Sequence, residues 1–299
     1  MSMLLKSELS LSNQPGMETA LVRTRCLVIL GLLLANCSRA QEIGAVTLLR
    51  ESSLRLIRGA SMFRGIEGMR LRLGDVLETG STMTAQAQLE LAGSAIVELG
   101  PSTQVYLFSQ TETATEIVLL KGWLKGETTS GNCRYLNSRL SVATKGGNVV
   151  MHVHENAADA FVERGSVSVT FRSGVTMTSS PQKIFFASRV SQPDAAMGRP
   201  SQEFTNGMPI CFRDILPSRL SRFAGKTAPE PESDHVVSYP EVAQLLTLPP
   251  SWREGLVVRF KPRLENREFR RAIEAHIGIL PEWKPALDPE QYKSGAAHP

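Results

Sequence analysis

Apolar and polar residues alternate most regularly between residues 73 and 107. In residues 86–91, Ala and Leu occupy one side and Gln and Glu the other, which is the period-two pattern of a half-buried strand. Gly93 and Ser94 turn the chain, residues 95–99 form a second strand, and residues 100–103 turn it again. This stretch predicts a β scaffold around which the rest of the chain is organised.

The same pattern continues on both sides of this stretch. Further strands are predicted at residues 43–49, 54–57, 116–120, 123–124, 140–143, 149–154, 160–163, 166–171 and 175–178. Many short strands with turns at regular spacing favour an all-β roll, solenoid or sandwich. We therefore expect a mainly β region over residues 41–178.

The composition changes after residue 178. Residues 179–208 and 224–233 are rich in Pro, Ser, Gln and Gly, which predicts exposed linkers. Between them, residues 210–223 are apolar enough to dock against another part of the chain. We therefore expect a linker over residues 179–235 with a docking segment near 210–223.

The last segment, residues 236–299, has a helical period. Ser238 and Ser251 each begin a capping box, with a Glu three residues later, and the run that begins at Asp288 repeats this pattern. Asn266 caps a helix that places Phe269, Ile273, Ile277 and Leu280 on one face. Four short helices form a small α-helical C-terminal appendage, which we expect to pack on the roll because it is marginal alone.

A resemblance to a known family is carried by the order and spacing of several short motifs. These are Gly74-Asp75-Val76-Leu77-Glu78-Thr79-Gly80, Leu89-Glu90-Leu91-Ala92-Gly93-Ser94, Val97-Glu98-Leu99-Gly100-Pro101-Ser102-Thr103, Val118-Leu119-Leu120-Lys121-Gly122-Trp123-Leu124, Val142-Ala143-Thr144 and Phe161-Val162-Glu163-Arg164-Gly165-Ser166-Val167. Together they resemble the FecR-type domain, a periplasmic module named after a ferric-citrate signalling regulator, over about residues 44–171. One departure is Ala92, where the family usually has Asp, so a turn-capping side chain is lost.

The resemblance implies a short solenoid-like β roll and contact with other envelope proteins. FecR regulators also have a cytoplasmic anti-sigma segment and a membrane-spanning helix before the periplasmic domain. This sequence has no room for the first and no apolar run long enough for the second, so signalling to a sigma factor is not carried over.

The amino terminus predicts export. Arg23 and Arg25 precede an apolar run over residues 26–35, and small residues surround Arg39 before Gln41, as in a signal peptide cleaved near Ala40. Residues 1–40 are therefore interpreted as a signal peptide, with Met1 or Met17 as the start. Residues 34–37 also resemble a lipobox, so lipidation of Cys37 and anchoring as a lipoprotein remain the alternative to a soluble periplasmic protein.

Charge and cysteine content narrow the function classes. The 299 residues carry a net charge of +4, and removal of residues 1–40 leaves +2, which is no electrostatic footprint for nucleic acid. Only Cys133 and Cys211 remain after processing, and in an oxidising compartment we expect them to pair. Two unpaired buried thiols are the alternative.

His152 and His154 are the sharpest candidates for chemistry. Residues two apart on a strand share a face, so both imidazoles could reach one metal ion. With Gly146, Asp159 and Gly165 the pair resembles the first metal motif of cupins, although Asp159 replaces the usual Glu. The remaining histidines lie in the linker and tail, so we expect no metal site and no cofactor.

Two further sets of side chains have a structural and a functional interpretation. A basic run could contact anionic envelope components and give peripheral outer-membrane association. The default interpretation is that its members pair with neighbouring glutamates on a solvated helix face. The run comprises Arg253, Arg259, Lys261, Arg263, Arg267, Arg270 and Arg271. Four aromatic residues could line a carbohydrate surface or pack the core of the helical unit, which we favour; they are Tyr239, Trp252, Trp283 and Tyr292.

The sequence as a whole predicts an exported, non-enzymatic binding or scaffold protein of the bacterial cell envelope, with an envelope protein or cell-wall polymer as its partner. It contains no nucleophile elbow, P-loop or dinucleotide fingerprint. Two alternatives stay open: a peptidoglycan or polysaccharide binder, and a cupin-like metal-dependent enzyme.

Overall fold

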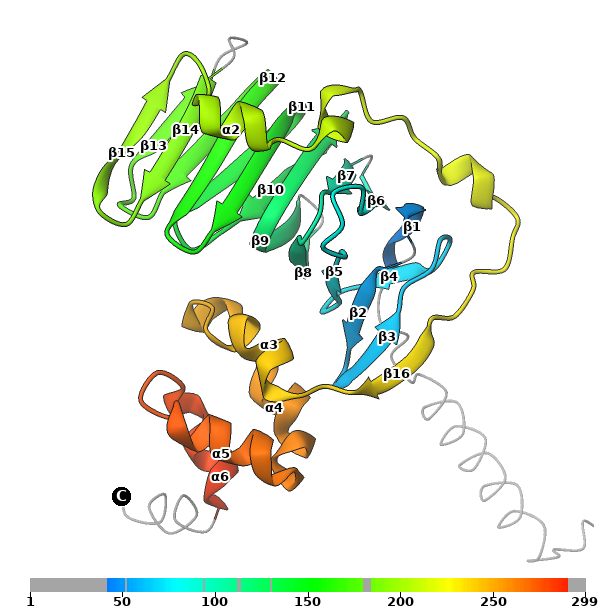
Figure 1. The fold of residues 1–299 in the computed structure, drawn as a ribbon, viewed down its shortest axis with the longest axis vertical. Coiled ribbons are helices and arrows are strands. Elements are labelled where there is room, and N and C mark those ends of the chain that lie inside the picture. Colours follow the sequence, from blue (N-terminus) through cyan, green and yellow to red (C-terminus); the bar gives the residue numbers. More distant parts are fainter. Residues whose placement is uncertain are drawn as a thin grey trace, which may run out of the picture. The chain divides into compact units, whose positions relative to one another are not determined.

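The computed structural model describes residues 42–289, apart from 52, 94, 112–113, 130 and 180–183. In this part of the chain a 16-stranded sheet is followed by short helices (Figure 1). The strands are β1 (Glu42–Arg50), β2 (Arg55–Arg58), β3 (Ser61–Arg64), β4 (Arg70–Arg72), β5 (Val76–Glu78), β6 (Gln86–Leu91), β7 (Ala95–Leu99), β8 (Gln104–Gln110), β9 (Thr115–Thr128), β10 (Cys133–Leu136), β11 (Leu140–His154), β12 (Ala157–Phe171), β13 (Thr176–Ser179), β14 (Ile184–Arg189), β15 (Gln192–Met197) and β16 (Glu232–Val236).

The helices all follow β15. They are α2 (Gln202–Gly207), α3 (Tyr239–Leu246), α4 (Leu256–Phe260), α5 (Arg267–Ala275) and α6 (Lys284–Leu287), with 3₁₀ turns η1 (Ile210–Arg213), η2 (Leu220–Phe223), η3 (Pro250–Trp252), η4 (Lys261–Glu265) and η5 (Pro281–Trp283). Within the described ranges, none of these helices has the length and apolar character needed to cross a membrane.

Three long strands divide the sheet into two layers, because β9, β11 and β12 each change partners halfway along. The first layer contains β6, β7 and β14 together with residues 122–128, 147–154 and 157–162. The second layer contains β8, β10 and β13 together with residues 115–121, 140–144 and 167–171. The long strands therefore pass from one layer to the other, which is the form of a roll.

One apolar core fills the space between the layers. Each strand turns every second side chain inward, so both layers contribute to the same cluster. Its members include Val97, Leu99, Leu124, Val149 and Met151 from the first layer and Val105, Leu107, Ile117, Tyr135 and Val142 from the second. All of these side chains are fully buried. We call this set the inner core.

Glycines permit the bend of the long strands. Gly122 has φ of 88°, and a Cβ atom there would lie 2.6 Å from the Thr103 Cα. Gly165, at the bend of β12, has φ of 91°. Residues with a side chain rarely adopt this left-handed backbone conformation, so glycine is required where a strand leaves one layer for the other.

The two outer faces are covered in different ways. On the second layer, Tyr106, Val118 and Leu120 form an apolar cluster with residues of α3 to α5 and η5. On the first layer, residues 209–219, which we call the strap, follow α2 across the sheet and insert Phe212 beside Val150 and Phe185. The helical segment therefore packs on the roll, as expected.

The prediction of a mainly β fold followed by short helices is confirmed. Glu241 completes the expected capping box of α3, and the Asn266 side chain accepts a hydrogen bond from the Phe269 amide at the start of α5. The helix α5 ends at Ala275, so Leu280 is buried from a position beyond it.

The interpretation of residues 179–208 as an exposed linker differs from the structure. The strands β14 and β15 continue the first layer there, and α2 follows. The side chains of Phe185 and Phe186 are buried on opposite faces of β14, one against the strap cluster and the other in the inner core. The burial of two adjacent aromatic side chains, one on each face, stabilises a strand here despite the turn-forming composition around it.

We expect Gly122→Ala to destabilise the roll more than Gly174→Ala. Both glycines have positive φ, but a Cβ at Gly174 meets nothing within 4 Å. The control should lose about 1–2 kcal/mol of unfolding free energy, which is the cost of the left-handed conformation, and Gly122→Ala should lose at least twice that. Urea denaturation followed by circular dichroism measures both. Equal losses would show that close packing at the bend is unimportant.

Candidate functional site

A cleft with a volume of about 1150 Å³ opens beside Gly122, at the bend of β9. Residues 206–210 of the α2–strap segment form part of its lining, and Gln244 and Leu248, in and just after α3, form another part. Its polar and aromatic lining includes Lys121, Trp123, Arg139, His152, His154 and Arg213. The cleft therefore combines cationic and aromatic groups with an apolar border.

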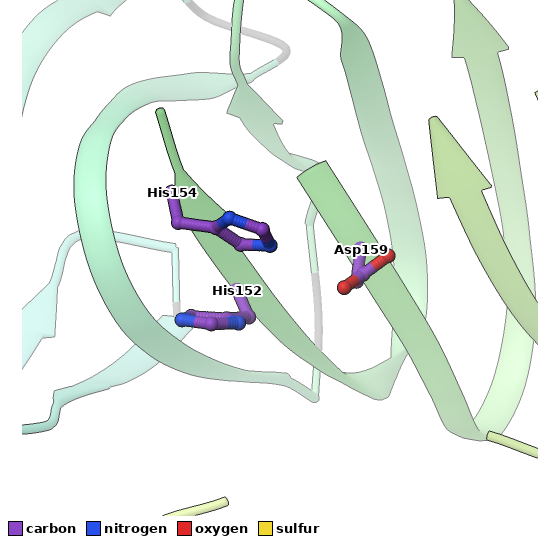
Figure 2. A group of neighbouring side chains, drawn as sticks. All are labelled: His152, His154 and Asp159. Carbon is purple, nitrogen blue, oxygen red and sulfur yellow. The ribbon is translucent and has the colours of Figure 1, made fainter. Parts of the chain in front are cut away.

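The two predicted histidines line this cleft, and Asp159 lies beside them. His152 and Asp159 are direct partners on the antiparallel strands β11 and β12, and His154 lies two residues further along the same face. Figure 2 shows the three side chains on neighbouring strands. One ligand atom from each lies within 4.8 Å of the others. The sequence-predicted pair is thus brought together with the acidic residue named beside it.

Packing constrains each member of this group differently. The His152 ring stacks on Trp123 with ring centroids 3.9 Å apart, and burial lowers the pKa of His152 to about 4, with the neighbouring His154 and Arg189 adding to the shift. His154 is exposed. Asp159 is buried, and Arg189 binds both of its carboxylate oxygens, one of them at 3.1 Å.

The chemistry of this group is that of a three-ligand metal position. Two imidazoles and a carboxylate suit zinc or another transition metal and leave room for a further ligand. Burial raises the pKa of Asp159 despite the Arg189 guanidinium. That ion pair competes with a metal for the carboxylate, although a carboxylate has lone pairs left after a bidentate contact.

The two cysteines are not brought together. Cys133 lies in the inner core, whereas Cys211 lies in the strap on the outer face of the first layer, and both are free thiols. Burial raises the pKa of each thiol to about 12. The structure thus lacks the predicted disulfide, because one strand layer separates the two side chains.

Cys211 instead contacts Glu98, which is 1% exposed. Burial raises the pKa of Glu98 to about 7, and the Cys211 thiol, Lys125, Arg219 and Arg50 oppose this shift. Gln86 also donates a hydrogen bond to Glu98. A carboxyl group is therefore held beneath the strap with a pKa close to neutral pH, so that it keeps its proton in mildly acidic solution.

The predicted basic run is divided by the structure. Arg253 and Arg259 point into the molecule, where they bind backbone carbonyl groups and Arg253 also pairs with Glu282. Arg263 donates to the Val237 carbonyl, and Arg270 pairs with Glu274 one helical turn away. The exposed members that remain are Lys261, Arg267 and Arg271.

The described aromatic candidates pack against the helical segment. Trp283 is fully buried, and Tyr239 and Trp252 pack against the same apolar cluster. Tyr292, the proposed lipidation site Cys37, the cleavage site near Ala40 and both start candidates lie outside the described residues. The aromatic set therefore offers no exposed carbohydrate platform within the described ranges.

The FecR-like motif residues hold turns. Thr79 donates to the Gly100 carbonyl at 2.6 Å and accepts from the Thr103 amide at 2.9 Å. Asp75 is 1% exposed and accepts two hydrogen bonds from Arg58. Glu163 pairs with Lys125 at 3.0 Å.

Sequence reasoning missed a set of buried polar residues on the outer face of the first layer. The set comprises Gln88, Glu90, Glu98, Lys125 and Glu127, each at most 6% exposed. They alternate with inner-core residues on β6, β7 and β9. The recurrence of large polar residues at alternate positions of three neighbouring strands was the available signal, but the same pattern is expected of a solvated face.

Comparisons with known proteins find only distant structural similarity. No protein-family model matches the chain, and no curated protein matches it. Two crystal structures of a "putative anti-sigma factor" from Parabacteroides distasonis match with TM-scores of 0.38 and 0.37 and identities of 12% and 14%. Each match covers 44% of this chain and 62% of that chain. The likeness is too distant to carry an argument about function.

We expect the contribution of Glu98 to the free energy of unfolding to fall as pH rises from 4.5 to 7. The native state holds a proton that the unfolded state releases in this window, because the pKa rises from 4.5 to about 7 on folding. The contribution is fully lost above pH 7 and amounts to at most about 3 kcal/mol.

Glu98→Gln tests this directly. The variant should be more stable than the wild type at pH 8 and should lose this part of the pH dependence, as measured by chemical denaturation at several pH values. The exposed Glu155→Gln change serves as the matched control. A wild-type and a Glu98→Gln curve that run parallel across the window would contradict the assignment.

Proposed function

We propose that this chain is an exported, non-enzymatic binding protein of the bacterial cell envelope, and that its FecR-type β region contacts another envelope protein. The proposal combines the motif pattern of residues 44–171, the predicted signal peptide and one structural observation. That observation is the open end of the roll.

The open end consists of β13 and β15. Among the described strands, β13 pairs with β12, and β15 pairs with β14 alone, so the outer edge of β15 has no strand partner in the described ranges. Val175, Met177 and Val190 at this end are between 36% and 58% exposed. They line a groove of about 820 Å³.

Such an end suits a protein partner. Free strand edges present unpaired backbone groups that a partner can extend by strand addition, and the exposed apolar side chains supply pockets for alternate residues. Arg139 and Arg172 line the groove and favour an acidic partner segment, whereas the Arg189 guanidinium is already paired with Asp159. A polysaccharide would need exposed aromatic platforms here, and the groove lining offers Phe171 alone, which is buried.

Site-specific crosslinking in cells tests this proposal. A photoreactive residue at Val190 should capture one or a few envelope proteins, and the same residue at Val258, which is 79% exposed on α4, should not. A Met177→Asp change should abolish capture, because it places a charge in the apolar groove. Equal capture at Val190 and Val258, or none at Val190 in a stably folded protein, would contradict the proposal.

One observation favours a second candidate function, which is metal-dependent chemistry in the cleft. The structure places Asp159 beside the His152 and His154 pair, so three ligand atoms of two types lie within 4.8 Å of one another. Exposed Glu203 on α2 acts on Asp159 electrostatically and contributes to its raised pKa. A resident zinc ion in this position would supply a Lewis acid at the wall of the cleft.

Calorimetric titration of chelator-treated protein with zinc separates the two candidates. The metal candidate predicts one ion per chain, and at least tenfold weaker binding in His152→Ala and in His154→Ala. His235→Ala, which alters a histidine outside the cleft, should leave binding unchanged. Absence of stoichiometric binding in the wild type would eliminate the metal-dependent candidate and leave the binding protein.

A further inference from the structure

The strap covers a polar surface of the first layer. Beneath it lie Gln88, Glu90, Glu98, Lys125 and Glu127, all buried. Only two apolar side chains of the strap are buried, Phe212 and Leu216. The strap is therefore placed mainly by polar contacts, unlike the helical segment on the other outer face.

Most of these polar contacts are to the strap backbone. Lys125 donates to the carbonyl groups of Phe212 at 2.5 Å and Asp214 at 2.9 Å. Gln88 donates to the Pro217 carbonyl at 2.9 Å. Strand side chains thus bind three carbonyl groups along the strap.

Two carboxylates bind the strap amides. Glu127 accepts a hydrogen bond from the Leu216 amide at 3.3 Å, and Glu90 accepts from the Arg219 amide at 2.5 Å. Ser218 adds a hydroxyl contact to Glu90 at 2.6 Å. Together with the three carbonyl contacts, this arrangement binds a peptide backbone in one direction and provides two pockets for apolar side chains four residues apart.

The strap is also loosely fitted. A cavity of about 280 Å³ remains between the strap and the sheet, lined by polar groups that include Arg50, Gln86 and Arg219. Burying the charged groups of the groove has a desolvation cost that opposes the gain from its hydrogen bonds. The segment after the strap is largely exposed up to β16 and contains Gly225 with φ of 71°. Its contacts with the roll include the partly exposed Arg222–Glu67 ion pair at 3.5 Å and Phe223 beside Gly68.

We propose that this outer-face groove is a peptide-binding site that the strap occupies as an internal ligand, and that a segment of a partner protein with the same two-anchor chemistry takes the place of the strap. The partner segment carries an aromatic and an aliphatic residue four positions apart. A second copy of this chain is disfavoured as the donor, because the strap is internal and its transfer would carry the whole helical segment with it. The inference concerns a surface distinct from the open end and does not rest on the proposed function.

A labelled synthetic peptide of residues 208–220, with Cys211→Ser to prevent oxidation, tests this inference by fluorescence anisotropy. The receptor is the full chain with Phe212→Ser and Leu216→Ser, which weakens the strap and leaves the groove intact. This receptor should bind the peptide at least tenfold more tightly than the wild type does, because the internal strap competes less. A peptide that carries the same two substitutions should not bind.

A pair of lysine variants locates the binding. Lys125→Met in the receptor should weaken peptide binding at least tenfold, whereas Lys121→Met, the same change on the same strand but paired with Glu78 outside the groove, should not. If circular dichroism shows that the double strap variant does not fold, the single variant Leu216→Ala serves as the receptor in its place, and its peptide binding is compared with that of the wild type. A folded receptor that fails to bind, equal effects of the two lysine changes, or dimerisation of the receptor without peptide binding would overturn the inference.

Discussion

The buried ammonium group of Lys125 is the interaction on which the arrangement of the first layer depends. It is 2% exposed and is satisfied by Glu163 from β12 and by two carbonyl groups of the strap. A buried cation without such partners is strongly unfavourable, so the strap must lie where its carbonyl groups meet Lys125. The position of the strap in turn sets Pro209 and Arg213 in the lining of the cleft that contains His152 and His154.

Three surfaces of one roll therefore carry different chemistry. The second layer is closed by apolar packing against the helices, as Tyr106, Val118 and Leu120 show. The first layer is closed by polar contacts to the strap backbone together with the apolar cluster around Phe204 and Phe212. The end formed by β13 and β15 is left open. Binding at an open edge and exchange at a polar groove are both compatible with a rigid inner core, because neither disturbs the side chains between the layers.

The sequence pattern predicted the inward side of each strand well and the outer side poorly. Leu89 and Leu91 are buried, as their alternation implies, but Gln88 and Glu90 on the supposedly solvated side are 1% and 6% exposed. A period of two residues identifies two faces, but it cannot tell what covers the second one. The cover comes from residues 209–219, more than a hundred positions away, and only the tertiary fold brings them there.

Local spacing likewise predicted part of the candidate site. It placed His152 and His154 on one face. The pairing of His152 with Asp159 depends on the strand register, which the spacing does not give. The ion pair of Asp159 with Arg189 depends on β14, a strand that lies in a stretch rich in Pro, Ser and Gln. The cysteine pairing was wrong for a related reason, since two thiols on opposite sides of a sheet layer look equivalent in a sequence.

Hydrogen exchange of the strap amides in the intact chain, followed by mass spectrometry, tests the central role of Lys125 most directly. The account predicts that Leu216 and Arg219 are protected in the wild type and that Lys125→Met lowers their protection at least tenfold, while the inner-core strands β9 and β11 keep theirs. Strap amides that exchange at the unprotected rate in the wild type, or that are equally protected in the variant, would contradict it.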